Sequence, residues 1–165
     1  MNRHAVPDLS HYFTGSWALS RRIIDRRAGI VGRLSGHAQF KPDETGLGYD
    51  ESGVVSYGNH EGLAHQSYHW DIHENGLAEV RFKDGRLFHQ LDLTTGAAIV
   101  DHPCAADQYR GEFRVATQNR WVTLWQITGP RKDLILISRF RRVPATVLDS
   151  VAALDVVPAD TSLRR

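Results

Sequence analysis

The sequence predicts an all-β fold, a single up-and-down antiparallel β-barrel of about ten strands. Three observations predict it. Apolar and polar residues alternate with a period of two along most of the chain, which is typical of strands that bury one face. Turn sequences such as Asp84-Gly85 separate the alternating segments. Near the start, Gly15 and Trp17 project to the same face of a first strand, an arrangement typical of the closed end of small barrels.

The individual strands follow from the alternation. In residues 33–41, the small or apolar residues at even positions alternate with polar neighbours, so the even positions are expected to face the interior. The pattern returns at Ala78, Val80 and Phe82, just before the Asp84-Gly85 turn. The same reasoning places the other strands at residues 13–25, 47–57 with a kink near Gly53, 65–73, 87–93, 97–102, 109–117, 121–128 and 134–143. Because most connections have hairpin length, a meander is favoured over a Greek key, and closure on itself would remove its exposed edges.

Length and composition fit one domain. The chain has 165 residues, of which 41% are hydrophobic, enough for one barrel core. Residues 1–143 are expected to form the barrel. In residues 144–165 the period changes, and this segment could be a short docked helix, a poorly ordered tail or part of a homodimer interface. The residues that recur there at helical spacing are Val147, Leu148, Val151 and Leu154.

Charge and composition narrow the partners. A net charge of +1 provides no electrostatic footprint for nucleic acid, and arginines such as Arg21 and Arg22 are interpreted as a solvated strand end. Cys104 is the only cysteine, so no internal disulfide can form; we interpret it as a small buried residue. Neither a signal peptide nor the roughly twenty apolar residues of a membrane span is present. We therefore expect a cytoplasmic protein without a nucleic-acid or membrane partner.

Several motifs, in their order along the chain, resemble a known family. The two most specific are residues 102–111, which begin with His102-Pro103-Cys104, and residues 129–133. They follow Gly15-Ser16-Trp17 and the segments 32–38, 49–53, 68–70 and 84–88. In this pattern the chain resembles a bacterial family of unassigned function with a small calycin, lipocalin-like β-barrel. The resemblance ends near residue 142 and implies a fold and an interior cavity, with no established activity.

Polar residues that the alternation sends inward are the candidates for function. The densest set is His102, Cys104, Asp107 and Tyr109, around a turn between two expected strands. One interpretation makes it a structural corner, in which polar groups tie the turn down. The other makes it the polar end of a pocket, with His102 exchanging a proton and Tyr109 orienting a ligand oxygen.

Tryptophans supply the apolar part of the candidate site. Trp121 and Trp125 share a strand face, and the row is either pure core or a flat wall for a ligand. The full set of candidate ligand-binding residues is Trp17, His89, His102, Asp107, Tyr109, Trp121 and Trp125.

Three histidines at a spacing of four, His65, His69 and His73, raise the question of a metal site. On a strand they share one face, opposite Trp70 and its apolar neighbours. Strand residues four apart are separated by about 13 Å, too far to bind one ion. We therefore expect the aromatic face to point inward, the histidines to face water, and no metal to be bound.

Two classes of function fit these observations. The favoured one is non-enzymatic binding of a small, partly apolar ligand inside the barrel, with no cofactor. The alternative is an enzyme acting on a small hydrophobic substrate, with His102 and either Tyr109 or His89 as the acid–base pair. No nucleophile elbow, phosphate loop or paired zinc cysteines occur, which favours binding. Haem binding, as in nitrobindin-like barrels, would call for a histidine in a late strand, and none follows His102.

Overall fold

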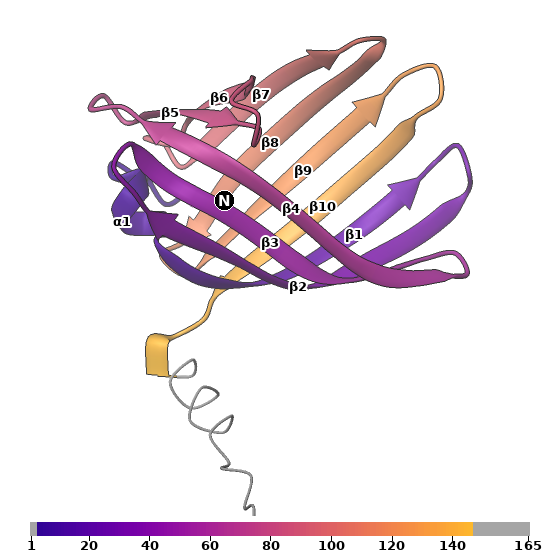
Figure 1. Ribbon diagram of the computed structural model, residues 1–165, viewed down its shortest axis with the longest axis horizontal. Coiled ribbons are helices and arrows are strands. Elements are labelled where there is room, and N and C mark those ends of the chain that lie inside the picture. The colour runs from indigo at the N-terminus through magenta and orange to yellow at the C-terminus, as the bar shows by residue number, and fades with distance from the viewer. Residues whose placement is uncertain (1–2, 147–165) are drawn as a thin grey trace, which may run out of the picture.

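The computed structural model describes residues 3–146, which form one antiparallel sheet curled into a barrel (Figure 1). The ten strands are β1 (Gly15–Asp25), β2 (Ile30–Pro42), β3 (Gly46–Tyr57), β4 (His60–Ile72), β5 (Leu77–Arg81), β6 (Leu87–Asp92), β7 (Ala97–Cys104), β8 (Asp107–Thr117), β9 (Arg120–Thr128) and β10 (Asp133–Arg142). Consecutive strands pair with each other except β6 and β7, and β1 also pairs with β10, which gives the order β6-β5-β4-β3-β2-β1-β10-β9-β8-β7. The predicted all-β fold and its meander are confirmed.

The first and last strands close the barrel. Trp17 of β1 pairs with Arg142 of β10 on one side and with Ala38 of β2 on the other. A seam remains between β6 and β7, where no ladder pairs the two strands within residues 3–146. Side chains bridge this seam: the His102 ring of β7 contacts the Phe88 ring of β6 edge-on, with centroids 5.0 Å apart. The barrel is therefore nearly closed.

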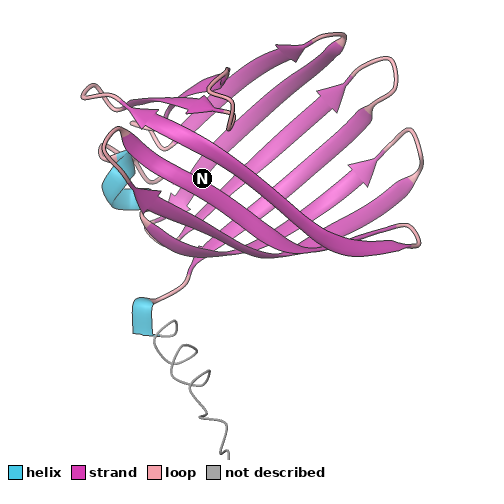
Figure 2. Cartoon of the chain, viewed as in Figure 1, coloured by secondary structure: helices cyan, strands magenta, loops and turns pink. Residues whose placement is uncertain are grey.

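A short helix that the alternation did not predict covers one end of the barrel (Figure 2). Helix α1 spans Leu9–Phe13, so β1 begins at Gly15 and not at the expected residue 13. Asp8 caps the helix, because its carboxylate accepts a hydrogen bond from the backbone N–H of His11 at 2.9 Å. Five residues are too few for a helical period to stand out in the sequence.

Trp17 ties α1 to the base of the barrel. Its side chain is 0% exposed, and its indole N–H donates to the backbone oxygen of Phe13 at 2.9 Å. The guanidinium of Arg142 lies 4.2 Å from the Trp17 ring centre and donates to the backbone oxygen of Thr14. Trp17 therefore lies at the base of the barrel, as expected.

The expected kink near Gly53 is a close approach of two strands. Gly53 of β3 pairs directly with Gly36 of β2. A Cβ atom on Gly36 would lie 2.0 Å from the backbone oxygen of Ser52 and 2.5 Å from the Cα of Gly53. Paired glycines let the two backbones come so near, and the register of β2 and β3 runs without a break through this pair.

The histidines of β4 lie on the outer face, as expected from the burial of Trp70. His69 lies between two carboxylates, with its Nε2 at 2.8 Å from Asp43 and its Nδ1 at 3.1 Å from Asp71. His73 lies near Glu79, 3.7 Å away. These are contacts of an exposed charged face rather than of the interior.

Two further expectations concern the end of the chain and its cysteine. The apolar spacing of residues 147–154 lies outside the described residues, and the described barrel ends at Arg142. Cys104, expected to be buried, is exposed at the end of β7 because this end of the strand runs beyond the packed interior. In residues 3–146, no helix is long and apolar enough to cross a membrane.

Candidate functional site

The half of the interior next to α1 is filled by aromatic side chains. Phe13 lies at the centre, with ring centroids 5.1 Å from Phe40, 4.9 Å from Trp70 and 5.1 Å from Trp121. The last of these is edge-on, an arrangement that aromatic rings favour. This base is a packed core and holds the walls of the barrel at a fixed separation.

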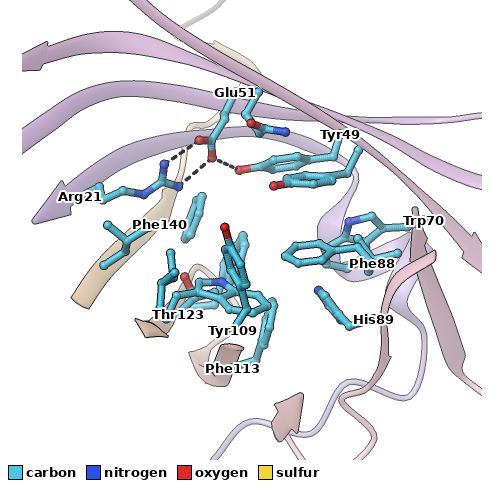
Figure 3. Close-up of a pocket in the computed structure, with 17 residues that line it drawn as sticks. Arg21, Tyr49, Glu51, Trp70, Phe88, His89, Tyr109, Phe113, Thr123 and Phe140 are labelled. Atoms are coloured by element: carbon cyan, nitrogen blue, oxygen red, sulfur yellow. Dashed lines mark hydrogen bonds and ion pairs between the residues drawn. The ribbon is translucent and has the colours of Figure 1, made fainter. Parts of the chain in front are cut away.

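Above this base the interior is hollow. A cavity of about 210 Å³ lies among inward-facing side chains from eight strands (Figure 3). Its wall is polar at the end near Arg21 and Glu51 and mainly aromatic elsewhere. The lining residues are Arg21, Tyr49, Glu51, Gln66, Tyr68, Trp70, Val80, Phe88, His89, Tyr109, Phe113, Trp121, Thr123, Trp125, Ile127, Leu136 and Phe140.

A buried ion pair forms the polar end of the cavity. The Arg21 guanidinium donates from Nη1 to one oxygen of Glu51 at 2.7 Å and from Nη2 to the other at 2.9 Å. Its Nε–H donates to the hydroxyl of Ser138 at 2.7 Å, and the hydroxyl of Tyr49 donates to Glu51. Arg21, interpreted from the sequence as part of a solvated strand end, therefore points inward, because β1 continues the alternation that begins at Trp17.

The surroundings keep Arg21 and Tyr49 in fixed protonation states. Burial alone would lower the pKa of Arg21, but the hydrogen bonds and charge of Glu51 outweigh burial and raise it. Burial, together with the neighbouring charge of Glu51, raises the pKa of Tyr49 well above its usual range. Arg21 is therefore a cation and Tyr49 a neutral hydrogen-bond donor near neutral pH.

Stacked rings form one wall of the cavity. The Phe88 ring lies nearly parallel to Tyr68 on one side and to Trp125 on the other, with interplanar angles of 15° and 13°. Gly111 makes room for this stack, because a Cβ atom at that position would lie 2.8 Å from the Trp125 ring. The glycine within the motif of residues 102–111 thus positions a cavity wall.

His89 is the buried histidine of the site. It lies on β6, is 5% exposed, and has its ring centre 5.5 Å from both Phe113 and Trp125. Burial lowers its pKa to about 4, so the imidazole is neutral near pH 7. In Figure 3 it lies at the far side of the group from Arg21.

Tyr109 connects the cavity to the rim of the barrel. Its ring lines the cavity, and its hydroxyl accepts a hydrogen bond from the Lys132 ammonium at 3.3 Å. Lys132 also pairs with Asp107 at 2.7 Å, and hydrogen bonds to Asp107 and Tyr109 raise its pKa. Asp107 fits against Gly129, where a Cβ atom would lie 1.9 Å from its carboxylate. The corner and pocket interpretations thus apply to different residues. Asp107 holds Lys132 in an ion pair at the rim, and Tyr109 lines the cavity.

The structure brings four of the seven candidate residues together on the cavity wall: His89, Tyr109, Trp121 and Trp125. The other three do not line it. Trp17 lies in the packed base, His102 packs across the seam, and Asp107 lies at the rim.

Sequence reasoning missed the polar end of the site. Arg21 is four residues after Trp17 and Glu51 is two residues after Tyr49, so alternation sends both inward. This parity was the available signal. The charge of the two side chains argued against an inward position, because Arg and Glu are almost never buried unless they are paired. A single sequence does not show that pairing.

Comparison with known proteins defines the family. Residues 13–142 match the model of a family of unknown function (DUF6314). The chain belongs to this family. No curated protein matches it.

Solved structures with the same fold are distant in sequence. The structure of an S-type phycobiliprotein lyase from Guillardia theta has a TM-score of 0.61 and 11% identity, with 87% of this chain and 95% of that chain covered. A protein of unknown function from the DUF3598 family of Nostoc punctiforme has a TM-score of 0.55 and 11% identity. That match covers 82% of this chain but only 49% of the other, so this chain spans about half its length. At such identities the similarity supports the barrel fold alone.

Proposed function

We propose that this member of the DUF6314 family binds a small, partly apolar ligand in the interior cavity and does so without catalysing a reaction. The observation that carries the proposal is the hollow itself. The base of the barrel is filled by its own rings, whereas the wall above it lines a hollow of about 210 Å³ that is partly open. Interiors are normally packed with few voids larger than a water molecule, so a cavity of this size with a few converging polar groups is typical of a binding site.

The size of the cavity limits the ligand. A dry cavity of about 150 Å³ is enough to bind benzene, whereas pockets for drug-sized ligands span about 300–1,000 Å³. At about 210 Å³, this cavity lies between the two. It fits one ring with one or two small substituents.

The arrangement of the candidate acid–base residues favours binding over catalysis. His102 and Tyr109 approach ring to ring with centroids 6.0 Å apart, and no hydrogen bond joins them. His102 lies outside the cavity wall, and the Tyr109 hydroxyl is bonded to Lys132. The activity of a lyase with this fold is not evidence for the same activity in this chain, because the two sequences are only 11% identical. A cytoplasmic location and a homodimer remain predictions.

Native mass spectrometry tests the proposal. The full chain is purified from its own cells without denaturation and compared with Thr123→Phe, which fills the cavity from β9, and Leu63→Ala, an exposed control. We expect wild type and Leu63→Ala to retain one small molecule and Thr123→Phe to lose it. If Thr123→Phe does not fold cooperatively, Leu136→Trp on β10 replaces it. Wild-type protein that is free of any bound molecule, or filled variants that retain it, would contradict the proposal.

A further inference from the structure

We infer that the ligand is an uncharged, flat, single-ring molecule that carries a hydrogen-bond acceptor at one end and a hydrogen-bond donor at the other. The inference rests on the proposed function and deepens it. It follows from the polar atoms on the cavity wall that have no partner among residues 3–146, and from the charges around them. These atoms include the hydroxyl of Tyr68, Nε2 of His89 and the buried indole N–H of Trp121, which is a further donor.

The end near Arg21 offers donors. The carboxylate of Glu51 is occupied by Arg21 and Tyr49, and Arg21 uses three of its five N–H groups on Glu51 and Ser138. The hydroxyl of Tyr68 lines the same cavity and has no hydrogen-bond partner among residues 3–146. Burial raises the pKa of Tyr68 to about 12, so this hydroxyl keeps its proton. A ligand carbonyl oxygen would satisfy it.

The end at His89 offers an acceptor. The Nδ1 atom lies 3.3 Å from the backbone oxygen of Gln90. A carbonyl oxygen can only accept, so Nδ1 carries the proton of the neutral ring, and Nε2 presents a lone pair. Within the described part of the chain, Nε2 has no partner and is not sealed from the cavity that His89 lines. A ligand hydroxyl or N–H group would donate to it.

The charges on the wall favour a neutral ligand. Arg21 and Glu51 cancel each other, and His89 is neutral at pH 7. A charged ligand would lose its water here and would find no free charge of opposite sign on the wall. Burying an unpaired charge in a largely apolar site costs free energy. Phe88 lies stacked between Tyr68 and Trp125, so these rings turn their edges to the cavity, and edge-to-face packing against them favours a flat aromatic ring.

Four compounds separate these features by isothermal titration calorimetry on the full chain at pH 7. 4-Hydroxyacetophenone has both the donor and the acceptor. 4-Methylacetophenone replaces the donor with a methyl group of similar size, and 4-ethylphenol replaces the acceptor with a methylene. 4-Hydroxybenzoate carries a negative charge. We expect 4-hydroxyacetophenone to bind about tenfold more tightly than either neutral analogue, and 4-hydroxybenzoate to bind at least about a hundredfold more weakly.

Two variants assign each end. His89→Phe keeps a ring but removes the acceptor, so it should abolish the advantage of 4-hydroxyacetophenone over 4-methylacetophenone only. Tyr68→Phe keeps its ring and removes the donor, so it should reduce the advantage over 4-ethylphenol only. His37→Phe, on the outer face, is the matched control and should change nothing. Thermal unfolding of each variant checks that it is folded.

The outcomes separate this inference from the proposed function. Equal binding of the three neutral compounds, unaffected by either variant, would overturn the inference while cavity binding stands. Tight binding of 4-hydroxybenzoate would also overturn it. If none of the compounds binds, the inference is wrong, and the proposed function then stands only if mass spectrometry finds a molecule retained by the wild type and lost from Thr123→Phe.

Discussion

At the scale of residues, burial of the ion pair between Arg21 and Glu51 adds little free energy of folding, and the pair forms the polar end of the cavity. Breaking a buried pair by removing one charge leaves the other uncompensated and costs about 3–5 kcal/mol, whereas replacing the whole group by apolar residues is often neutral. Glu51→Gln should therefore lower the free energy of unfolding in urea by about 3–5 kcal/mol.

The matched comparison replaces the group together. Arg21→Met/Tyr49→Phe/Glu51→Leu should be only about 1–3 kcal/mol less stable than wild type, because no charge is left unpaired and only the buried hydroxyl of Ser138 loses its partner. It should keep the selectivity for acceptor-bearing rings that comes from Tyr68, and lose only the part that comes from the two remaining N–H groups of Arg21. An apolar triple variant as unstable as Glu51→Gln would show that the pair is needed for folding rather than for binding.

His89 predicts a pH dependence of stability. Its pKa is about 4 in the folded protein and 6.5 in the unfolded chain, so the unfolded chain binds the proton first as pH falls. The contribution to stability is therefore complete above pH 6.5 and is lost as pH falls toward 4. At about 1.4 kcal/mol per pKa unit it amounts to about 3 kcal/mol.

Urea unfolding at pH 7 and pH 4 measures this effect. The loss of stability between the two pH values should be smaller by about 3 kcal/mol in His89→Gln than in wild type. His60→Gln, an exposed histidine, serves as the control and should behave as wild type. The same pH dependence in His89→Gln and wild type would contradict the burial of a neutral imidazole.

Trp17 carries the base of the barrel. Trp17→Ala removes a fully buried ring that contacts Trp121 and Arg142, and should cost about 3–5 kcal/mol in urea unfolding. Leu63→Ala, at a side chain that is 90% exposed, is the control and should cost under about 0.5 kcal/mol. Similar midpoints for the two variants would be incompatible with this base.

At the scale of elements, the close approach of the neighbouring strands β2 and β3 depends on two glycines, Gly36 and Gly53. Gly36→Ala forces a methyl group against the backbone of β3 and should cost about 3 kcal/mol, because neither strand can retreat without breaking its ladder. Gly48→Ala is the control, since its Cβ would meet only the Lys41 backbone oxygen at 3.8 Å. Thermal unfolding of both variants decides: equal melting temperatures would show that the strands have room to separate.

The C-terminal segment is expected to be separable from the barrel. Val143 still bonds to β1, through its N–H and the backbone oxygen of Ser16 at 2.9 Å, so truncation after Val143 keeps every described strand and its closure. The truncated chain should unfold cooperatively at nearly the wild-type temperature. A chain that fails to fold, or one that changes from dimer to monomer in size-exclusion chromatography, would place residues 144–165 in the core or in a dimer interface.

At the scale of the whole molecule, period-two alternation was enough to predict the barrel, because ten strands with one buried face repeat the same signal. Asp84-Gly85 predicted the β5–β6 hairpin for the same local reason. Helix α1 escaped prediction because it is a single short turn that tertiary contacts stabilise.

The candidate site was harder to predict than the fold. Trp121, Trp125 and Tyr109 follow from strand parity, and they do line the cavity. His102 has the right parity but lies at the seam, which depends on where the barrel fails to close. The pairing of Arg21 with Glu51 becomes intelligible only when β1 and β3 lie on either side of β2 in the sheet, an arrangement that no local pattern encodes.

A crystal structure of the full chain with 4-hydroxyacetophenone tests the central claim most directly. The account predicts the ring against Phe88 and Trp125, its carbonyl oxygen about 2.7–3.2 Å from the hydroxyl of Tyr68, and its hydroxyl at the same separation from Nε2 of His89. A cavity without the compound, or the compound bound only on the outer surface of the barrel, would contradict it.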